Sequence, residues 1–263
     1  MRKALLALVA LIVVGLVVVF GFGQKHVPAA PEAPEPKLPK QTWSFAGPFG
    51  TYDRAASQRG YQVYEEICSR CHSMNQLHYR DLVGLGYNED EVKAIAAQKQ
   101  VTDGPNDQGE MFQRPGRPYD KFVAPFANEQ LARATLNGAL PPDLSLIDKA
   151  REGGADYIVA LLTGYKDPPP AGVKLSDNMM YDDYFPGHQI GMPPPLAGDD
   201  VKYGDGTKPT MRQEAADVAT FLAWAAEPTM EERKRTGAKV IIFLLVMTIV
   251  LYAAKRQVWA KVH

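Results

Sequence analysis

The stretch Cys68-Ser69-Arg70-Cys71-His72 constrains this chain more than any other feature of its sequence. Two thiols separated by two residues and followed at once by an imidazole form the Cys-x-x-Cys-His pattern, which attaches a c-type haem covalently. The thiols add to the two vinyl groups of one porphyrin, and the adjacent imidazole becomes an axial ligand of its iron. The motif therefore predicts one covalent haem c, held by Cys68 and Cys71 and ligated by His72.

Two other kinds of site also use closely spaced cysteines. A zinc site needs two further soft or imidazole ligands at motif spacing, and the sequence has only two cysteines. A thioredoxin-like redox pair needs a βαβ context, which residues 57–67 do not resemble. Because both cysteines belong to the motif, no disulfide is available to stabilise the fold, and burial of the porphyrin is expected to form the centre of the core.

An apolar run, Ala4 to Phe20, follows Met1-Arg2-Lys3 near the amino terminus. A basic start before an apolar run is the pattern of a secretory signal, but this run reaches the lower length limit for spanning a bilayer. Residues 1–23 are therefore interpreted as a signal peptide or an N-terminal anchor. The proline-rich residues 24–42 are interpreted as a semi-extended linker.

A second apolar run, Val240 to Ala254, has lysine and arginine residues on both sides. This pattern predicts one transmembrane helix, with residues 233–263 as a C-terminal anchor and cytoplasmic tail. Covalent haem attachment occurs on the exported side of bacterial membranes. Residues 43–232 are therefore expected to form a periplasmic domain on the bacterial inner membrane, in contact with membrane lipid.

The residues between the linker and the second apolar run show helical periodicity and no alternating strand pattern. Asn88 and Thr210 are N-cap signals, and Gly138 and Gly164 are stop signals. The expected helices cover residues 53–71, 129–137, 144–152, 156–163 and 210–227, and a further helix starts at Asn88 and turns Val92, Ile95 and Ala96 inward. These features predict an all-α, cytochrome c-like haem domain with long Pro/Gly loops, the largest at residues 105–125 and 166–209. The net charge of −1 gives no support for a nucleic-acid partner.

An electron-transfer haem needs a second axial ligand, and methionine is the leading choice. Met192 stands out because Gly191 permits close backbone approach and the prolines at 193–195 stiffen the loop. The usual role of a methionine, filling a gap in the core, is the alternative. The other candidates are Met74, Met111, Met179, Met180, Met211, Met230, His78 and His188.

An ordered set of further stretches runs from Trp43 towards the carboxyl terminus. It includes Arg59-Gly60, Val63-Tyr64, Asp103-Gly104-Pro105-Asn106, Gly109-Glu110-Met111-Phe112, Arg114-Pro115-Gly116, Asn137-Gly138-Ala139-Leu140-Pro141-Pro142-Asp143-Leu144-Ser145, Ala150-Arg151, Gly153-Gly154, Asp156-Tyr157, Leu161-Leu162-Thr163-Gly164-Tyr165, Tyr184-Phe185-Pro186-Gly187, Ile190-Gly191-Met192 and Trp224-Ala225-Ala226-Glu227-Pro228. Together with the haem motif, this set resembles the cytochrome c1 family, the haem subunit of the cytochrome bc1 complex (ubiquinol-cytochrome c reductase).

The resemblance implies a role for several residues at the haem. Met192 is implied as the sixth ligand, so that His72 and Met192 are the two iron ligands. Arg151 and Tyr157 are implied to contact the haem propionates, where a guanidinium against a partly buried carboxylate is physically reasonable. The consecutive prolines Pro141 and Pro142 are implied to lie against the haem.

The resemblance also implies a function and a set of partners. The haem would take electrons from the Rieske iron-sulfur subunit, after quinol oxidation in the cytochrome b subunit, and pass them to a c-type cytochrome. The chain would serve an oxidoreductase without catalytic residues of its own, in a dimeric complex. Two rival interpretations are a stand-alone membrane-anchored c-type electron carrier and a structural assembly subunit with an incidental haem.

Residues 81–110 are a candidate docking segment for the acceptor. They contain seven acidic residues and two lysines, which leaves a net charge of −5. A basic cytochrome would be steered towards such a segment and released as the salt concentration rises. A solvated loop face with no partner is the alternative.

Overall fold

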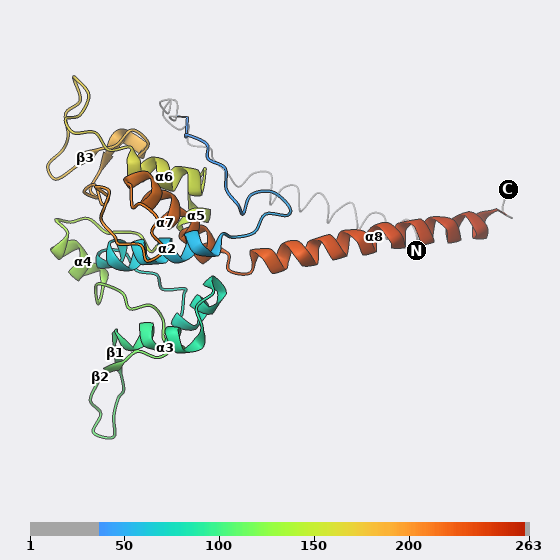
Figure 1. The fold of residues 1–263 in the computed structure, drawn as a ribbon, viewed down its shortest axis with the longest axis horizontal. Helices are drawn as coiled ribbons and strands as arrows, with labels where there is room; N and C mark the ends of the chain where they lie inside the picture. Colours follow the sequence, from blue (N-terminus) through green and yellow to red (C-terminus); the bar gives the residue numbers. More distant parts are fainter. Residues whose placement is uncertain (1–36, 261–263) are drawn as a thin grey trace, which may run out of the picture. The chain divides into compact units, whose positions relative to one another are not determined.

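The computed structural model describes residues 37–260, so the predictions for residues 1–23 and for most of the linker lie outside the described residues. Helices dominate the fold, which confirms the all-α prediction (Figure 1). The α-helices are α2 (Arg54–Glu66), α3 (Glu89–Ala97), α4 (Glu129–Thr135), α5 (Ile147–Ala150), α6 (Ala155–Thr163), α7 (Met211–Ala226) and α8 (Met230–Trp259). Three short 3-10 helices are η1 (Cys68–Arg70), η2 (Tyr79–Leu85) and η3 (Pro186–His188).

Helices α2 and α7 pack directly on each other and form the scaffold of the haem domain (Figure 1). A Cβ atom added at Gly60 of α2 would lie 1.9 Å from the backbone oxygen of Asp217 in α7. Only glycine permits this approach. Around the crossing, Tyr61 and Tyr64 each pack 5.6 Å from the Phe221 ring, and these rings are buried. Aromatic burial of this kind supplies much of the free energy of folding.

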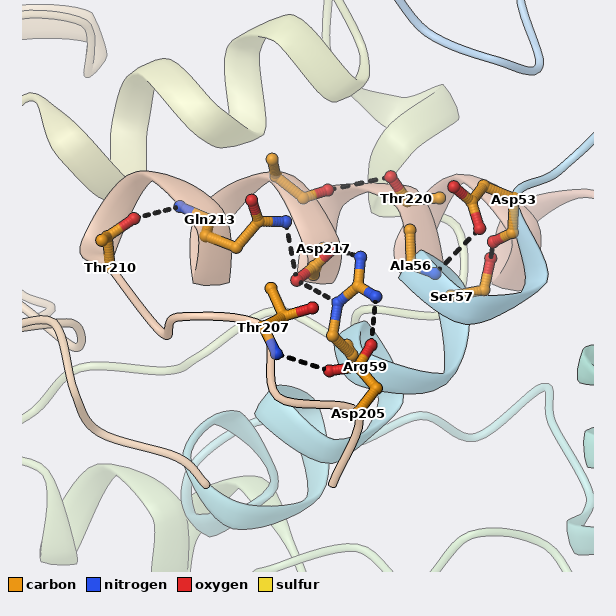
Figure 2. Close-up of polar contacts among 11 residues, drawn as sticks. Asp53, Ala56, Ser57, Arg59, Asp205, Thr207, Thr210, Gln213, Asp217 and Thr220 are labelled. Atoms are coloured by element: carbon orange, nitrogen blue, oxygen red, sulfur yellow. Dashed lines mark hydrogen bonds and ion pairs between the residues drawn. The ribbon is translucent and has the colours of Figure 1, made fainter. Parts of the chain in front are cut away.

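A buried ion pair joins the same two helices (Figure 2). The Arg59 guanidinium donates through Nε and Nη2 to the two carboxylate oxygens of Asp217, both at 2.9 Å. Its Nη1 donates to Asp205 at 2.7 Å, and Gln213 adds a further hydrogen bond to Asp217 at 3.0 Å. Because Asp217 is almost fully buried, loss of Arg59 would leave a buried charge without a partner.

The first predicted helix begins at the expected place but ends earlier. The Asp53 carboxylate caps α2 by accepting from the Ala56 amide at 3.0 Å, whereas the helix ends at Glu66. The Ser69 hydroxyl then donates to the Glu65 carbonyl at 2.6 Å, and the amides of Cys71 and His72 both donate to the Cys68 carbonyl. The haem motif therefore forms a separate tight turn, η1, instead of the last turn of α2.

Two short antiparallel hairpins were not expected from the sequence. Strand β1 (Gln100–Asp103) pairs with β2 (Phe112–Pro115), and β3 (Met180–Tyr181) pairs with β4 (Gln189–Ile190). Each strand has at most four residues, and the first pair buries neither face, so no alternating pattern marks it. The first hairpin is held by Arg114, which contacts the carboxylates of Asp103 and Asp120.

Helix α8 contains the predicted transmembrane run and starts ten residues before it, at Met230. Within residues 37–260 it is the one helix that is long and apolar enough to cross a membrane. Its first turns are attached to the haem domain. The Glu231 carboxylate accepts from the Tyr52 amide at 2.9 Å, and Lys234 donates to the backbone oxygens of Phe45 and Gly50 at 2.7 and 3.0 Å.

Candidate haem site

The turn η1 brings the two motif cysteines together directly after the scaffold helix α2. Both are free thiols, and both residues are half-buried. Burial, with a smaller contribution from Cys71, raises the pKa of Cys68 to about 12, so its sulfur is a protonated thiol at neutral pH. Neighbouring unpaired thiols on one rigid turn are the arrangement that covalent attachment of a single porphyrin requires.

The geometry of His72 fits an axial ligand of haem iron. Its Nδ1 atom lies 2.8 Å from the carbonyl oxygen of Pro142. Because a carbonyl can only accept, Nδ1 carries the proton and Nε2 is left with the lone pair that binds a metal. Burial lowers the pKa of His72, although the Pro142 hydrogen bond and Asp143 oppose this effect. The ring is therefore neutral, as a metal ligand must be.

The loop after the motif is fixed by Asp143, which sequence reasoning did not assign to the site. Its Oδ2 accepts from the Ser73 hydroxyl and the Asn75 amide, both at 2.8 Å, and its Oδ1 accepts from the Ser145 amide at 2.9 Å. Burial opposes ionisation, but these hydrogen bonds outweigh it and hold the pKa of Asp143 below its usual value. Asp143 directly follows Pro142, so the hydrogen bonds of Asp143 also fix the position of the Pro142 carbonyl that orients His72.

Met192 lies on a separate loop, two residues after β4. Met192 is half-buried, and its carbonyl oxygen accepts a hydrogen bond from the Tyr165 hydroxyl at 3.1 Å. A Cβ atom added at Gly191 would lie 3.6 Å from the Cβ of Ala139, which places this loop against the segment that leads to Pro141 and Pro142. Tyr165 was not assigned a role from the sequence, although it ends one of the stretches shared with the cytochrome c1 family.

Arg151 and Tyr157 lie close together near the start of α6. Burial raises the pKa of Tyr157, and the positive charge of Arg151 opposes this shift. Arg151 is exposed whereas Tyr157 is buried, so the pair presents a cation at the surface and a phenol beneath it. Such a pair is suited to hold a carboxylate at the edge of a buried group.

Apart from the pair Arg151 and Tyr157, the predicted site residues form two groups on different parts of the chain. The first contains Cys68, Cys71 and His72 with Pro142, and the second contains Met192 with Tyr165. Within residues 37–260, no hydrogen bond or ion pair joins the first group to the second. The two candidate axial ligands therefore come from separate loops.

One motif turn for a covalent haem defines the class of the molecule as a monohaem c-type cytochrome, and within residues 37–260 one helix is long and apolar enough to anchor it in a membrane. The chain belongs to the Cytochrome C1 family, whose family model matches residues 43–262. This result confirms the resemblance inferred from the sequence and the assignment of haem c as the cofactor.

Known relatives agree with this family. The chain is 47% identical over 240 residues to cytochrome c1 of Rhodospirillum rubrum, and the match covers 86% of this chain and 88% of the relative. It is 51% identical over 219 residues to the mitochondrial heme protein cytochrome c1 1 of Arabidopsis thaliana, covering 83% of this chain and 71% of the relative. It is also 46% identical over 248 residues to cytochrome b/c1 of Bradyrhizobium diazoefficiens, of whose length the match spans only 36%.

Proposed function

We propose that this chain is the haem c subunit of a cytochrome bc1 complex, where it takes single electrons from a Rieske iron-sulfur subunit and passes them to a c-type cytochrome. The observation that carries the proposal is the family match over residues 43–262, which includes the Cys-x-x-Cys-His turn. A relative named cytochrome b/c1 supports a cytochrome b subunit as a partner. The family supports a dimeric complex, in which this chain is an electron-transfer subunit without catalytic residues.

The chain's own residues bind and orient the cofactor. When bound, haem c supplies reversible one-electron oxidation and reduction of its iron. Cys68 and Cys71 would hold it through thioether bonds, and His72 would ligate the iron through Nε2, since its Nδ1 donates to Pro142. Pro141 and Pro142 lie against the ring in this proposal. One electron enters and one electron leaves, with no bond made or broken by the protein.

The environments of the candidate ligands support Met192 as the sixth ligand. Met74 and Met230 are buried among core residues, where a methionine fills a gap. Among the imidazole candidates, His188 Nδ1 is 3.1 Å from the Asp182 carbonyl and its ring stacks on Tyr181. Four of the other candidate methionines have more than a third of their surface exposed: Met111, Met179, Met180 and Met211. Met192 is half-buried, and the Tyr165 hydroxyl ties its loop to the segment that follows α6.

Arg151 and Tyr157 are proposed to hold the haem propionates. A propionate near the exposed Arg151 guanidinium would gain a charge-assisted hydrogen bond, which is stronger than a neutral one. The buried Tyr157 phenol would add a neutral donor from α6. These roles are consistent with the charge that Arg151 exerts on Tyr157.

The membrane arrangement is also a proposal. Residues 43–232 form the haem domain and residues 233–263 the anchor and its tail, with the helix itself starting at Met230. The haem domain is placed in the periplasm of a bacterium and α8 in the lipid of its inner membrane, because haem is attached to c-type cytochromes on the exported side. The attachment of Glu231 and Lys234 to residues 45–52 supports a haem domain held at a fixed height above the bilayer.

The acidic segment at residues 81–110 is a weaker docking surface than its net charge indicates. The Asp90 carboxylate pairs with Lys93 at 3.0 Å, and Asp103 pairs with Arg114, which lies outside the segment. Lys99, one of the two lysines of the segment, pairs with Glu65 outside it and therefore adds no free positive charge to the surface. Glu89, Glu91, Asp107 and Glu110 remain exposed. We propose that these four carboxylates steer a basic acceptor.

The proposal is tested on the complex extracted in mild detergent, by reduced-minus-oxidised spectroscopy and a redox titration. We expect a low-spin c-type haem of high potential that co-purifies with b-type haems and is reduced by quinol in an inhibitor-sensitive manner. A c-type haem that purifies alone and is not reduced by quinol would instead support the stand-alone carrier. Retention of full turnover in Met192→Leu would support the assembly-subunit interpretation.

A further inference from the structure

The loop that carries Met192 makes very few polar contacts of its own. Residues 193–195 are all proline and have no amide hydrogen to donate. For residues 191–195, the hydrogen bond from the Tyr165 hydroxyl to the Met192 carbonyl is the only one found within the described part of the chain. The position of Met192 therefore depends on Tyr165 and on the stiffness of the prolines.

Tyr165 is itself held firmly from both sides. It directly follows Gly164, which ends α6, and it pairs with Asp182 in an isolated β-bridge. The Asp183 amide donates to the Gly164 carbonyl at 3.1 Å, and the Lys166 amide donates to the Tyr181 carbonyl at 3.3 Å. The phenol that contacts Met192 thus projects from a backbone that is fixed to α6 and to the β3–β4 hairpin.

We propose that Tyr165 is a positioning residue for Met192. Its hydroxyl holds the Met192 backbone at the place from which the thioether reaches the sixth coordination position of the haem iron. The proposal rests on the assignment of Met192 as the sixth ligand under the proposed function. Since a thioether is a weak ligand, a small loss of positioning raises the population in which the sixth position is open to another ligand.

The test is an imidazole titration of the ferric haem in the intact, detergent-extracted complex. Imidazole competes with the Met192 sulfur, so its apparent affinity reports how often that position is open. Tyr165→Phe removes the hydroxyl and keeps the ring. We expect the imidazole concentration at half saturation to fall about fivefold, the equivalent of one neutral hydrogen bond of about 1 kcal/mol.

Tyr181→Phe is the matched control, because it removes a hydroxyl from the β3–β4 hairpin to which Tyr165 is bridged. The Tyr181 ring stacks on His188, and its hydroxyl makes no hydrogen bond with any residue between 37 and 260. We expect this variant to bind imidazole as the unmodified protein does. An equal effect in both variants would mean that general loosening of the hairpin is responsible, and would overturn the role of Tyr165.

Met192→Leu separates this proposal from the ligand assignment on which it rests. If Met192→Leu leaves the ferric spectrum and the imidazole titration unchanged, Met192 is not the sixth ligand and the assignment itself fails. If Met192→Leu opens the site but Tyr165→Phe titrates like the unmodified protein, the ligand assignment stands and the positioning role is overturned. A lower melting temperature of Tyr165→Phe without a change in imidazole affinity would likewise overturn it.

Discussion

The scaffold of the haem domain and the loops that carry the proposed ligands are held together in different ways. The α2–α7 pair combines buried aromatic rings, a close helix crossing at Gly60 and a buried ion pair between Arg59 and Asp217. The loops bearing His72 and Met192 are held mainly by individual hydrogen bonds. We therefore expect substitutions in the scaffold to lower the free energy of unfolding more than substitutions in the ligand loops do.

The two ligand loops also differ from each other. On the His72 side, the Asp143 carboxylate accepts three hydrogen bonds, and its pKa is held below the usual value. On the Met192 side, the buried carboxyl group of Asp182 directly follows β3; its Oδ2 has no hydrogen-bond partner among the described residues, and burial raises its pKa. Ionisation therefore stabilises the first loop and opposes the folding of the second.

The largest loss in the free energy of unfolding is expected in the scaffold, from Gly60→Ala. The new Cβ would overlap the Asp217 backbone oxygen and lie 2.8 Å from the Cβ of Phe221, so the two helices would have to separate. Separation would disturb packing along the whole interface, and we expect a loss of about 4 kcal/mol or more in the free energy of unfolding. Thermal unfolding of the detergent-solubilised chain, followed by circular dichroism, measures this loss.

Gly204→Ala is the control for this substitution, because an added Cβ at Gly204 meets no atom within 4 Å. We expect its stability to lie within about 0.5 kcal/mol of the unmodified protein, as is usual for exposed positions. If Gly60→Ala were equally mild, the helix crossing would not be the element that limits stability, and the contrast between scaffold and loops would fail.

The sequence predicted the scaffold well because its signals are local. Asn88 caps α3 as expected, accepting from the amides of Asp90 and Glu91, and the Thr210 hydroxyl accepts from the Gln213 amide at the start of α7. The Gln213 side chain donates to Asp217 one turn further along α7. In contrast, the ion pair of Asp217 with Arg59 joins residues 158 positions apart, which no local pattern encodes.

The second prediction concerns the His72 loop. Asp143→Ala would leave the amides of Asn75 and Ser145 without their acceptor, and hydrogen bonds to a charged group contribute more than neutral ones. We expect a loss of about 2 kcal/mol in the free energy of unfolding, which is smaller than the loss from Gly60→Ala. Unfolding at neutral pH, monitored by the same method, measures it.

Asp143→Asn provides the matched comparison. An amide keeps one acceptor oxygen, so it can serve either the Ser73 and Asn75 donors or the Ser145 donor, but not both groups. We expect the free energy of unfolding of Asp143→Asn to lie between that of the unmodified protein and that of Asp143→Ala. An asparagine variant as stable as the unmodified protein would show that the carboxylate charge and its second oxygen contribute nothing to this loop.

The ligand loops were harder to predict than the scaffold because their contacts join distant residues. The haem motif identified Cys68, Cys71 and His72 directly, since their spacing is itself the signal. In contrast, Asp143 reaches Ser73 across 70 residues, and Tyr165 reaches Met192 across 27. Family resemblance marked the stretches that contain these residues, but only their spatial arrangement indicates what each side chain does.

The smallest effect is expected on the Met192 side, from Asp182→Asn, and its sign depends on pH. Asp182 Oδ1 accepts from the amides of Tyr184 and Phe185, and an asparagine oxygen can accept both bonds. Burial raises the pKa of Asp182, with a further contribution from Asp183, while those two amides and His188 oppose the shift. Tyr157 and Tyr165 also face this carboxyl group, as its effect on both phenols shows.

A carboxyl group with a raised pKa in the folded state favours folding when protonated and opposes it when ionised. The unmodified protein should therefore lose stability relative to Asp182→Asn as the pH rises above about 3.9, the ordinary pKa of an aspartate, until the raised pKa is passed. Asp143 behaves in the opposite sense, because its lowered pKa makes its contribution fade as the pH falls. Unfolding of the unmodified protein, Asp182→Asn and Asp143→Asn between about pH 2 and pH 8 measures both trends, because the Asp143 contribution fades mostly below about pH 3.9. Parallel pH curves for the two asparagine variants would contradict the contrast between the two loops.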